Sequence, residues 1–143
     1  SIIERGRGYL SALQHHGIND TYIEEGLLLT QDAFEATLRL LKRAPQVTAI
    51  FACNDDVALG VIKAARELGR EIPEDLSIIG FDDIDLAQEI VPPLTTIHVD
   101  KVLMGVMALR QLRDRAANSD RPPIKSILTT LLMERESVAP IED

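Results

Sequence analysis

The 143-residue sequence predicts an α/β fold in which a parallel sheet is flanked by helices. Two apolar runs of strand length, VTAIFAC (residues 47–53) and LSIIGF (residues 76–81), do not alternate between apolar and polar side chains. Such runs are typical of parallel strands that are covered on both faces. Segments with helical periodicity precede and separate the two runs, so that strand and helix alternate through the first two thirds of the chain. This alternation implies right-handed crossovers with helices on the faces of the sheet.

Two helices are predicted before the first strand. Apolar side chains recur at helical spacing over residues 5–15, and Gly17 then offers a C-terminal stop. A short extended piece at residues 21–23 leads to the second helix, for which Thr30 or Asp32 can supply the N-cap. The apolar stripe of the second helix consists of Phe34, Leu38 and Leu41.

A third helix follows the first strand, and the regular alternation of strand and helix ends after the second strand. Its apolar positions are Ala58, Leu59, Ile62, Ala65 and Leu68, with Gly69 after its end. PPLTTIHVD (residues 92–100) then predicts an extended connection, because a proline pair and β-branched residues oppose helix. A helix with an apolar stripe from Val102 to Leu112 follows, then a loop at NSDRPP, and SILTTLLMERESV (residues 126–138) has the residue types of a strand.

Composition excludes several classes of protein. The net charge of −8 and the scattered Lys and Arg residues argue against a DNA-binding module within this segment. The single cysteine, Cys53, excludes an internal disulfide framework and fits a small buried side chain in a reducing compartment. No apolar segment approaches the ~20 residues that span a bilayer, and SIIERGRGYL lacks the apolar region of a signal peptide, so we expect no membrane contact and a cytoplasmic location.

The sequence offers little support for an enzyme, a metal site or a cofactor site. His15, His16 and His98 do not have the spacing of metal ligands, and solvated histidines at helix ends are the expected alternative. RGRG at residues 5–8 is too short to be a phosphate loop, and no GxGxxG or GxxxxGK[ST] motif is present. No serine lies in a nucleophile elbow, and Cys53 has no evident activating partner.

Polar side chains follow both predicted strands. Asn54, Asp55 and Asp56 come directly after VTAIFAC, and Asp82 and Asp83 come directly after LSIIGF. In an open parallel sheet, ligands bind outside the carboxyl ends of the strands, and carboxylate and amide oxygens there suit a ligand rich in hydroxyl groups. The alternative is that these residues have structural roles. One of residues 54–56 is expected to cap the next helix, and Asp82 and Asp83 could likewise be turn residues.

The order of these segments resembles the effector-binding region of the lactose-repressor/galactose-repressor (LacI/GalR) family of bacterial transcription regulators. The resemblance rests on RxxGY at residues 5–9, TAIFACNDDVALG at 48–60, IPEDLSIIGFDD at 72–83, PPLTTIHVD at 92–100 and the closing RESV. It implies a periplasmic-binding-protein-like fold (type I) of two α/β subdomains with a small ligand between them.

The resemblance also implies roles for individual residues. Arg5, Asn54 and Asp82 match positions that bind the effector, with Arg5 expected to hold a polar or anionic group of the ligand. Ser1 matches a position where the family often has a hydroxyl near the ligand. Leu28 matches a position often held by a stacking aromatic residue, which disfavours a flat ligand face, while Asp55 is expected to cap the helix.

By the same resemblance, the chain is an incomplete copy of the two-subdomain fold. Residues 1–96 correspond to the C-terminal subdomain without its first strand, residues 97–118 to a crossover and a helix that packs on the absent N-terminal subdomain, and residues 119–143 to the return into the C-terminal subdomain. Leu59 and Ile90 match positions at a homodimer interface, with ordinary core residues as the alternative. We expect the isolated segment to form a non-native or swapped dimer, or to leave the helix at 100–116 disordered.

The predicted function is therefore ligand sensing. A small effector, a sugar or related metabolite, would bind between the subdomains and control operator binding by a helix-turn-helix outside this sequence. The first alternative is a periplasmic sugar-binding protein of an ABC transporter, which shares the fold. An enzyme with a Rossmann-like sheet is the third class and is disfavoured by the absent phosphate loop.

Overall fold

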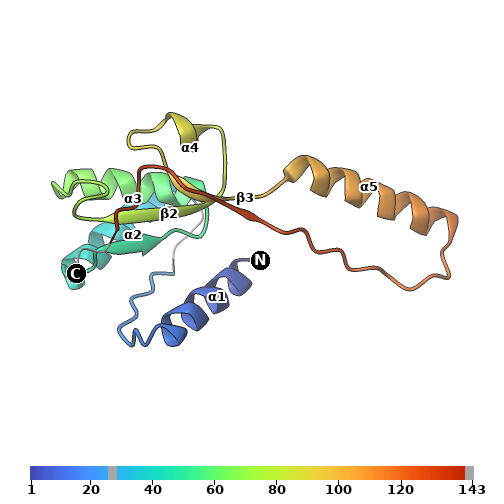
Figure 1. The fold of residues 1–143 in the computed structure, drawn as a ribbon, viewed down its shortest axis with the longest axis horizontal. Coiled ribbons are helices and arrows are strands. Elements are labelled where there is room, and N and C mark those ends of the chain that lie inside the picture. The colour runs from blue at the N-terminus through green and yellow to red at the C-terminus, as the bar shows by residue number, and fades with distance from the viewer. Residues whose placement is uncertain (26–28, 141–143) are drawn as a thin grey trace.

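A computed structural model describes residues 1–25 and 29–140 of the chain. Figure 1 shows a sheet with packed helices on one side of the view and one long helix that stands away from them. The elements along the chain are α1 (Ile2–His15), α2 (Thr30–Arg43), β1 (Ala49–Phe51), α3 (Asp55–Glu67), β2 (Ser77–Asp82), α4 (Leu86–Glu89), β3 (Thr95–His98), α5 (Lys101–Ala117) and β4 (Leu131–Met133).

The sheet is mostly parallel, as the sequence predicts. Its strand order is β1-β2-β3-β4, and β1, β2 and β3 are parallel to one another. β4 pairs antiparallel with β3, because the chain returns to the sheet from the far side of α5. The strand expected over residues 126–138 is confined to Leu131–Met133. Within the extended connection at residues 92–100, residues Thr95–His98 form the strand β3, which pairs with β2.

The core lies where α2 and α3 pack together and α3 covers the sheet. Its buried members are Leu41, Ala52, Ala58, Val61, Ile62, Ala65, Leu76, Ile78, Ala87 and Leu94. The two helices approach closely, since a Cβ atom at Gly60 would lie 2.3 Å from the backbone oxygen of Thr30. The predicted α3 stripe is wrong at its end, where Leu68 is the C-cap residue and is exposed.

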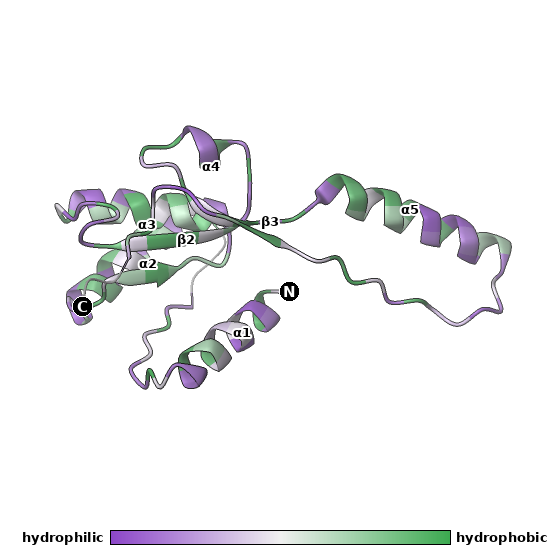
Figure 2. Cartoon of the chain, viewed as in Figure 1, coloured by the Kyte–Doolittle hydropathy of each residue, from purple (hydrophilic) through white to green (hydrophobic). Residues whose placement is uncertain are grey.

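Neither α1 nor α5 contributes a buried residue. α1 begins earlier than predicted, because the Ser1 hydroxyl accepts a hydrogen bond from the backbone N–H of Glu4 in a capping box. Its Tyr9 ring stacks on Phe51 of β1 at a centroid distance of 6.2 Å. α5 carries apolar residues along a helix that lies clear of the sheet, as Figures 1 and 2 show.

None of the helices within residues 1–25 and 29–140 combines the length and the apolar character that a bilayer crossing requires.

Gly80 of β2 leaves space for the buried carboxyl group of Asp55. A Cβ atom at this position would lie 2.2 Å from Oδ1 of Asp55 and 2.9 Å from Cδ2 of Leu94. We therefore expect Gly80→Ala to lower the free energy of unfolding by about 1–3 kcal/mol, the usual cost of overpacking a core. Urea denaturation of the chain measures this loss.

Gly8→Ala is the matched control, because a Cβ atom at Gly8 would meet nothing within 4 Å. In a helix interior, alanine is favoured over glycine by about 1 kcal/mol, so the control should be neutral or stabilising. Equal stability of Gly80→Ala and the parent chain would contradict the close contact with Asp55.

Candidate functional site

The polar residues after β1 divide their roles differently from the prediction. Asn54 is the N-cap of α3, and its Oδ1 accepts a hydrogen bond from the backbone N–H of Val57 at 2.8 Å. The expectation that Asp55 caps this helix is therefore wrong. Asp55 is the first residue of α3, with its carboxylate directed toward β3 and the loop after β2.

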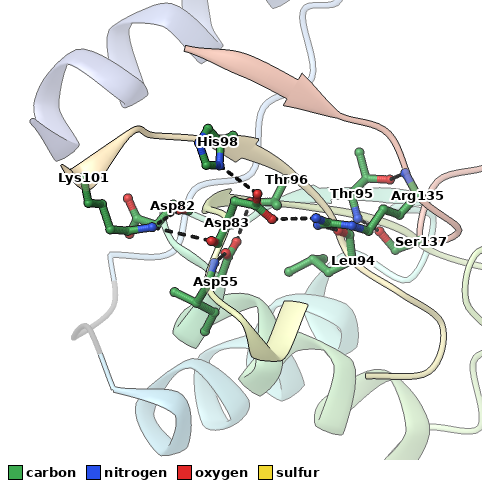
Figure 3. Close-up of polar contacts among 11 residues, drawn as sticks. Asp55, Asp82, Asp83, Leu94, Thr95, Thr96, His98, Lys101, Arg135 and Ser137 are labelled. Carbon is green, nitrogen blue, oxygen red and sulfur yellow. Dashed lines mark hydrogen bonds and ion pairs between the residues drawn. The ribbon is translucent and has the colours of Figure 1, made fainter. Parts of the chain in front are cut away.

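The Asp55 carboxylate is almost wholly buried, with the residue 1% exposed. Oδ1 accepts a hydrogen bond from Oγ1 of Thr96 at 2.6 Å, and Oδ2 accepts one from the backbone N–H of Ile84 at 2.9 Å (Figure 3). Burial raises the pKa of Asp55, although these two hydrogen bonds oppose the shift. This aspartate therefore joins α3, β3 and the loop after β2, and it faces no open surface.

Arg5 of α1 and Asp82 of β2 meet at the carboxyl end of the sheet. Nη2 of Arg5 lies 3.4 Å from Oδ1 of Asp82, and Nη1 donates to the backbone oxygen of Cys53. The guanidinium group also lies over the Phe81 ring, 3.6 Å from its centroid. The side chains of Arg5 and Asp82 remain 22% and 32% exposed, so a polar ligand can reach both.

Asp82 and Asp83 occupy a left-handed region of the backbone. Their φ angles are 111° and 50°, values that L-residues other than glycine rarely adopt and that cost about 1–3 kcal/mol each. The two successive carboxylates point to different partners, Asp82 toward Arg5 and Asp83 toward His98 and Arg135. Strain of this kind clusters at functional sites, and here it directs one carboxylate toward solvent and one inward.

Asp83 joins two segments that are distant in the sequence. Its Oδ1 lies 2.6 Å from Nη2 of Arg135 and its Oδ2 lies 2.8 Å from Nδ1 of His98 (Figure 3). Burial opposes ionisation of the Asp83 carboxyl, but the hydrogen bonds from Arg135 and His98 outweigh it and lower the pKa. The prediction of a solvated His98 at a helix end is therefore wrong, because His98 ends β3 and contacts a buried carboxylate.

The other predicted site residues lie at different places. Ser1 caps α1, and Leu28 lies outside the described residues. Leu59 and Ile90 line one groove on the surface, together with Ile62, Lys63, Arg66, Leu86 and Val91. Within residues 1–25 and 29–140, no group of three or more His, Cys, Asp or Glu residues is placed to hold a metal ion.

Sequence reasoning missed the contact between Asp83 and Arg135. The two residues are 52 positions apart, and no local pattern connects them. Arg135 is half-buried, and it also donates from Nη1 to the backbone oxygen of Leu94 at 2.7 Å. The one available signal is an arginine two residues after the apolar segment Leu131–Met133, which needs a buried acceptor if the segment joins the sheet.

The comparisons with known proteins agree with this geometry. Residues 1–138 match the family described as periplasmic binding protein-like domain. The chain belongs to this family. Its relatives are transcriptional regulators rather than enzymes, and the chain is part of the effector-binding domain found in the LacI family of such regulators.

Individual relatives show how much of the domain is shared. The HTH-type transcriptional repressor PurR of Haemophilus influenzae (strain ATCC 51907) is 44% identical over 103 residues, which cover 72% of this chain and 31% of that protein. A solved complex of the transcriptional regulator CelR with cellobiose matches with a TM-score of 0.90 and 35% identity, over 94% of this chain and 42% of that one. A LacI family regulator from Enterococcus faecium with bound ribose matches with a TM-score of 0.90 and 32% identity, over 99% of this chain and 53% of that one.

The chain thus spans a third to a half of the length of the relatives it matches. The LacI-family membership and the mostly parallel α/β fold implied by the sequence motifs are confirmed.

The lowered pKa of Asp83 makes part of the stability depend on pH. A carboxyl whose pKa in the fold lies below its ordinary value of 3.8 stabilises the fold above that value, and the contribution is lost as the pH falls through the folded-state pKa. We expect Asp83→Asn to be less stable than the parent chain above about pH 5, with a difference that shrinks toward about pH 3. Urea denaturation at a series of pH values measures it.

Asp85→Asn removes the same charge two residues away, from an exposed side chain without a capping hydrogen bond. This control should show little stability difference at any pH. If the stability difference between Asp83→Asn and the parent chain stays constant from neutral to acidic pH, the ion pair between Asp83 and Arg135 is contradicted.

Proposed function

We propose that this chain is the ligand-sensing part of a transcription regulator whose effector is a small polyhydroxylated molecule of the sugar class. The observation that carries the proposal is the Arg5–Asp82 pair, which stands half-exposed where β1 and β2 end. Ligands of open parallel sheets bind at this edge. A carboxylate can accept from two hydroxyls of a sugar at once, and a guanidinium donates to its oxygens in a fixed geometry.

Asn54 supports the same ligand class. Its Oδ1 accepts from the backbone N–H of Val57, and its Nδ2 makes no hydrogen bond to the residues that the structure describes. The amide can therefore serve as helix cap and as a donor to the effector at the same time. In this proposal Ser1 supplies a hydroxyl near the ligand. Cellobiose and ribose in the solved relatives support a sugar.

The proposal includes a division of the chain between two subdomains. In it, residues 1–96 belong to the subdomain that carries Arg5, Asn54 and Asp82, residues 97–118 lead into a second subdomain, and the residues from 119 onward return from it. Effector bound between the subdomains favours one closure angle, and in a homodimer joined through the Leu59–Ile90 surface that angle sets the spacing of two DNA-binding heads. A regulator that binds operator DNA in this way works in the cytoplasm.

Asp82→Ala tests the ligand site in the intact regulator. The variant removes charge-assisted hydrogen bonds worth about 1.5–3 kcal/mol each, so effector affinity should fall about 10- to 100-fold or more. Operator affinity without effector should stay close to that of the parent protein. Calorimetric titration with cellobiose, ribose and a wider sugar panel measures the first quantity, and fluorescence anisotropy with labelled operator measures the second.

Asp85→Ala is the control, because Asp85 is exposed on the same loop and its side chain caps no helix N–H. Unchanged sugar affinity in Asp82→Ala, or a panel in which no sugar binds the parent regulator, would contradict the proposed site.

The exposed surface of α5 tests the proposed division of the chain. Val102, Leu109 and Leu112 are 79%, 69% and 65% exposed, which is unusual for large apolar side chains on one helix. A helix without a packed face is marginal in water. In hydrogen exchange, we expect the amides of α5 to be nearly unprotected in residues 1–143 alone, and protected about 100-fold or more in the intact regulator.

The amides of α3, whose apolar face is buried, serve as the internal control and should be protected in both proteins. Similar protection of α5 in both proteins would mean that α5 does not pack on the second subdomain.

A further inference from the structure

The carboxylate of Asp83 stands at the junction of three chain segments. The residue follows Asp82 directly, and its side chain is 7% exposed. One oxygen binds Arg135 and the other binds His98, at 2.6 Å and 2.8 Å. Figure 3 shows the carboxylate between these two side chains. Both acceptor atoms of one buried group are therefore engaged by different segments.

These two segments are the outgoing and the returning connections of α5. β3 ends at His98, and the chain continues through residues 99 and 100 into α5. The return path forms β4, which pairs antiparallel with β3, and reaches Arg135 two residues after its end. Lys101, the first residue of α5, also donates from Nζ to the backbone oxygens of Asp82 and Asp83. The loop that carries Asp82 is thus bound to both connections.

The two contacts of Asp83 differ in how firmly their partners are held. Arg135 is fixed to the sheet, since its backbone N–H donates to Oγ1 of Thr95 at 2.9 Å and its Nη1 donates to the backbone oxygen of Leu94. The His98 side chain is 40% exposed, and its hydrogen bond to Asp83 lies at the end of β3, where the outgoing connection to α5 begins. Asp83 therefore links a rigid anchor to the start of the segment that leads to α5.

The backbone connects the position of Asp82 directly to that of Asp83. The two residues are adjacent and both have positive φ angles, which leaves few alternative conformations for the peptide between them. A ligand that shifts the Asp82 backbone would therefore also shift Asp83, and with it the bonds to His98 and Arg135. This provides a two-ended contact whose geometry can differ between the ligand-bound and ligand-free states.

We propose that Asp83 is a positioning residue that couples the effector site to the two connections of α5. It does not touch the effector, and it transmits the position of Asp82 to His98 and Arg135. The inference rests on the proposed function, in which Asp82 binds the effector and the connections act as the hinge. Loss of this contact should leave effector binding intact and reduce the effect of the ligand on DNA affinity.

The test uses the intact regulator, the tighter-binding of cellobiose and ribose, and an operator selected from a random DNA library. Coupling is the ratio of operator dissociation constants with and without saturating sugar, which is typically about 5- to 150-fold in allosteric proteins. For Asp83→Asn we expect this ratio to fall to about 1–3 while the dissociation constant for sugar changes less than about threefold. A general loss of stability would lower the active fraction without removing the ratio in the protein that remains folded.

A pair of substitutions at His98 tests the same contact on a half-exposed side chain. His98→Leu removes the donor and should reduce coupling as Asp83→Asn does. His98→Asn retains a donor near the position of Nδ1 and should keep coupling close to the parent value. This pair does not depend on whether the buried Asp83→Asn variant folds. Asp85→Asn is the charge-matched control and should couple normally.

The outcomes separate this inference from the proposed function. Full coupling in both His98→Leu and Asp83→Asn overturns the role of Asp83. The effector site would still be supported if the parent regulator binds sugar and Asp82→Ala does not. Loss of sugar binding in Asp83→Asn also overturns the inference, because Asp83 would then belong to the binding site. A parent regulator that binds neither sugar refutes both proposals.

Discussion

The hydrogen-bonded carboxylate of Asp55 is the interaction on which the carboxyl edge of the sheet depends. It starts α3, accepts from Thr96 of β3 at 2.6 Å and from the backbone of Ile84 at 2.9 Å, and occupies the space that a side chain at Gly80 would fill. A buried carboxylate without partners costs several kcal/mol, so these two donors are a requirement of the fold. The same group therefore holds the start of α3 to β3 and to the loop after β2. The positions of Asp82 and Asp83 follow from that loop.

The carboxyl edge of the sheet can hold strained residues because its surroundings determine their conformation. Positive φ angles at Asp82 and Asp83 cost about 1–3 kcal/mol each, and they persist only where neighbouring contacts exclude the relaxed alternatives. Ile84 is held by Asp55 on one side of the pair, and Asp83 is held by Arg135 and His98. The stability of the buried contacts thus maintains a backbone geometry that directs Asp82 toward Arg5. An arrangement of this kind is rigid before ligand arrives, which lowers the entropic cost of binding.

The sequence predicts the alternation of strands and helices well and the individual polar contacts poorly. Apolar runs and helical periodicity are local patterns, so they identify β1, β2, α2 and α3, whereas the pairing of β4 depends on where a returning chain meets the sheet. Asn54 and Asp55 are both good capping residues, and sequence alone cannot decide which one turns toward Thr96, because that contact spans 41 residues. The bond between Asp83 and Arg135 spans 52 residues and is equally invisible to local patterns. The resemblance to a family singled out both Arg5 and Asp82 as candidates, although they lie 77 residues apart, because it compares whole arrangements of residues.

Burial assigns different tasks to the three aspartates of this edge. Asp55 and Asp83 are inaccessible to ligand, and their hydrogen bonds are satisfied within the fold. The Arg5–Asp82 pair is partly exposed and 3.4 Å apart, and pairs of this kind stabilise a protein by only about 0–1 kcal/mol. The fold therefore gains little from keeping Asp82 charged in a strained backbone beside Arg5, and stability does not explain the arrangement. The proposed function gives the arrangement a role, because a partly exposed carboxylate and guanidinium held at a fixed separation can exchange water for the hydroxyl groups of a ligand.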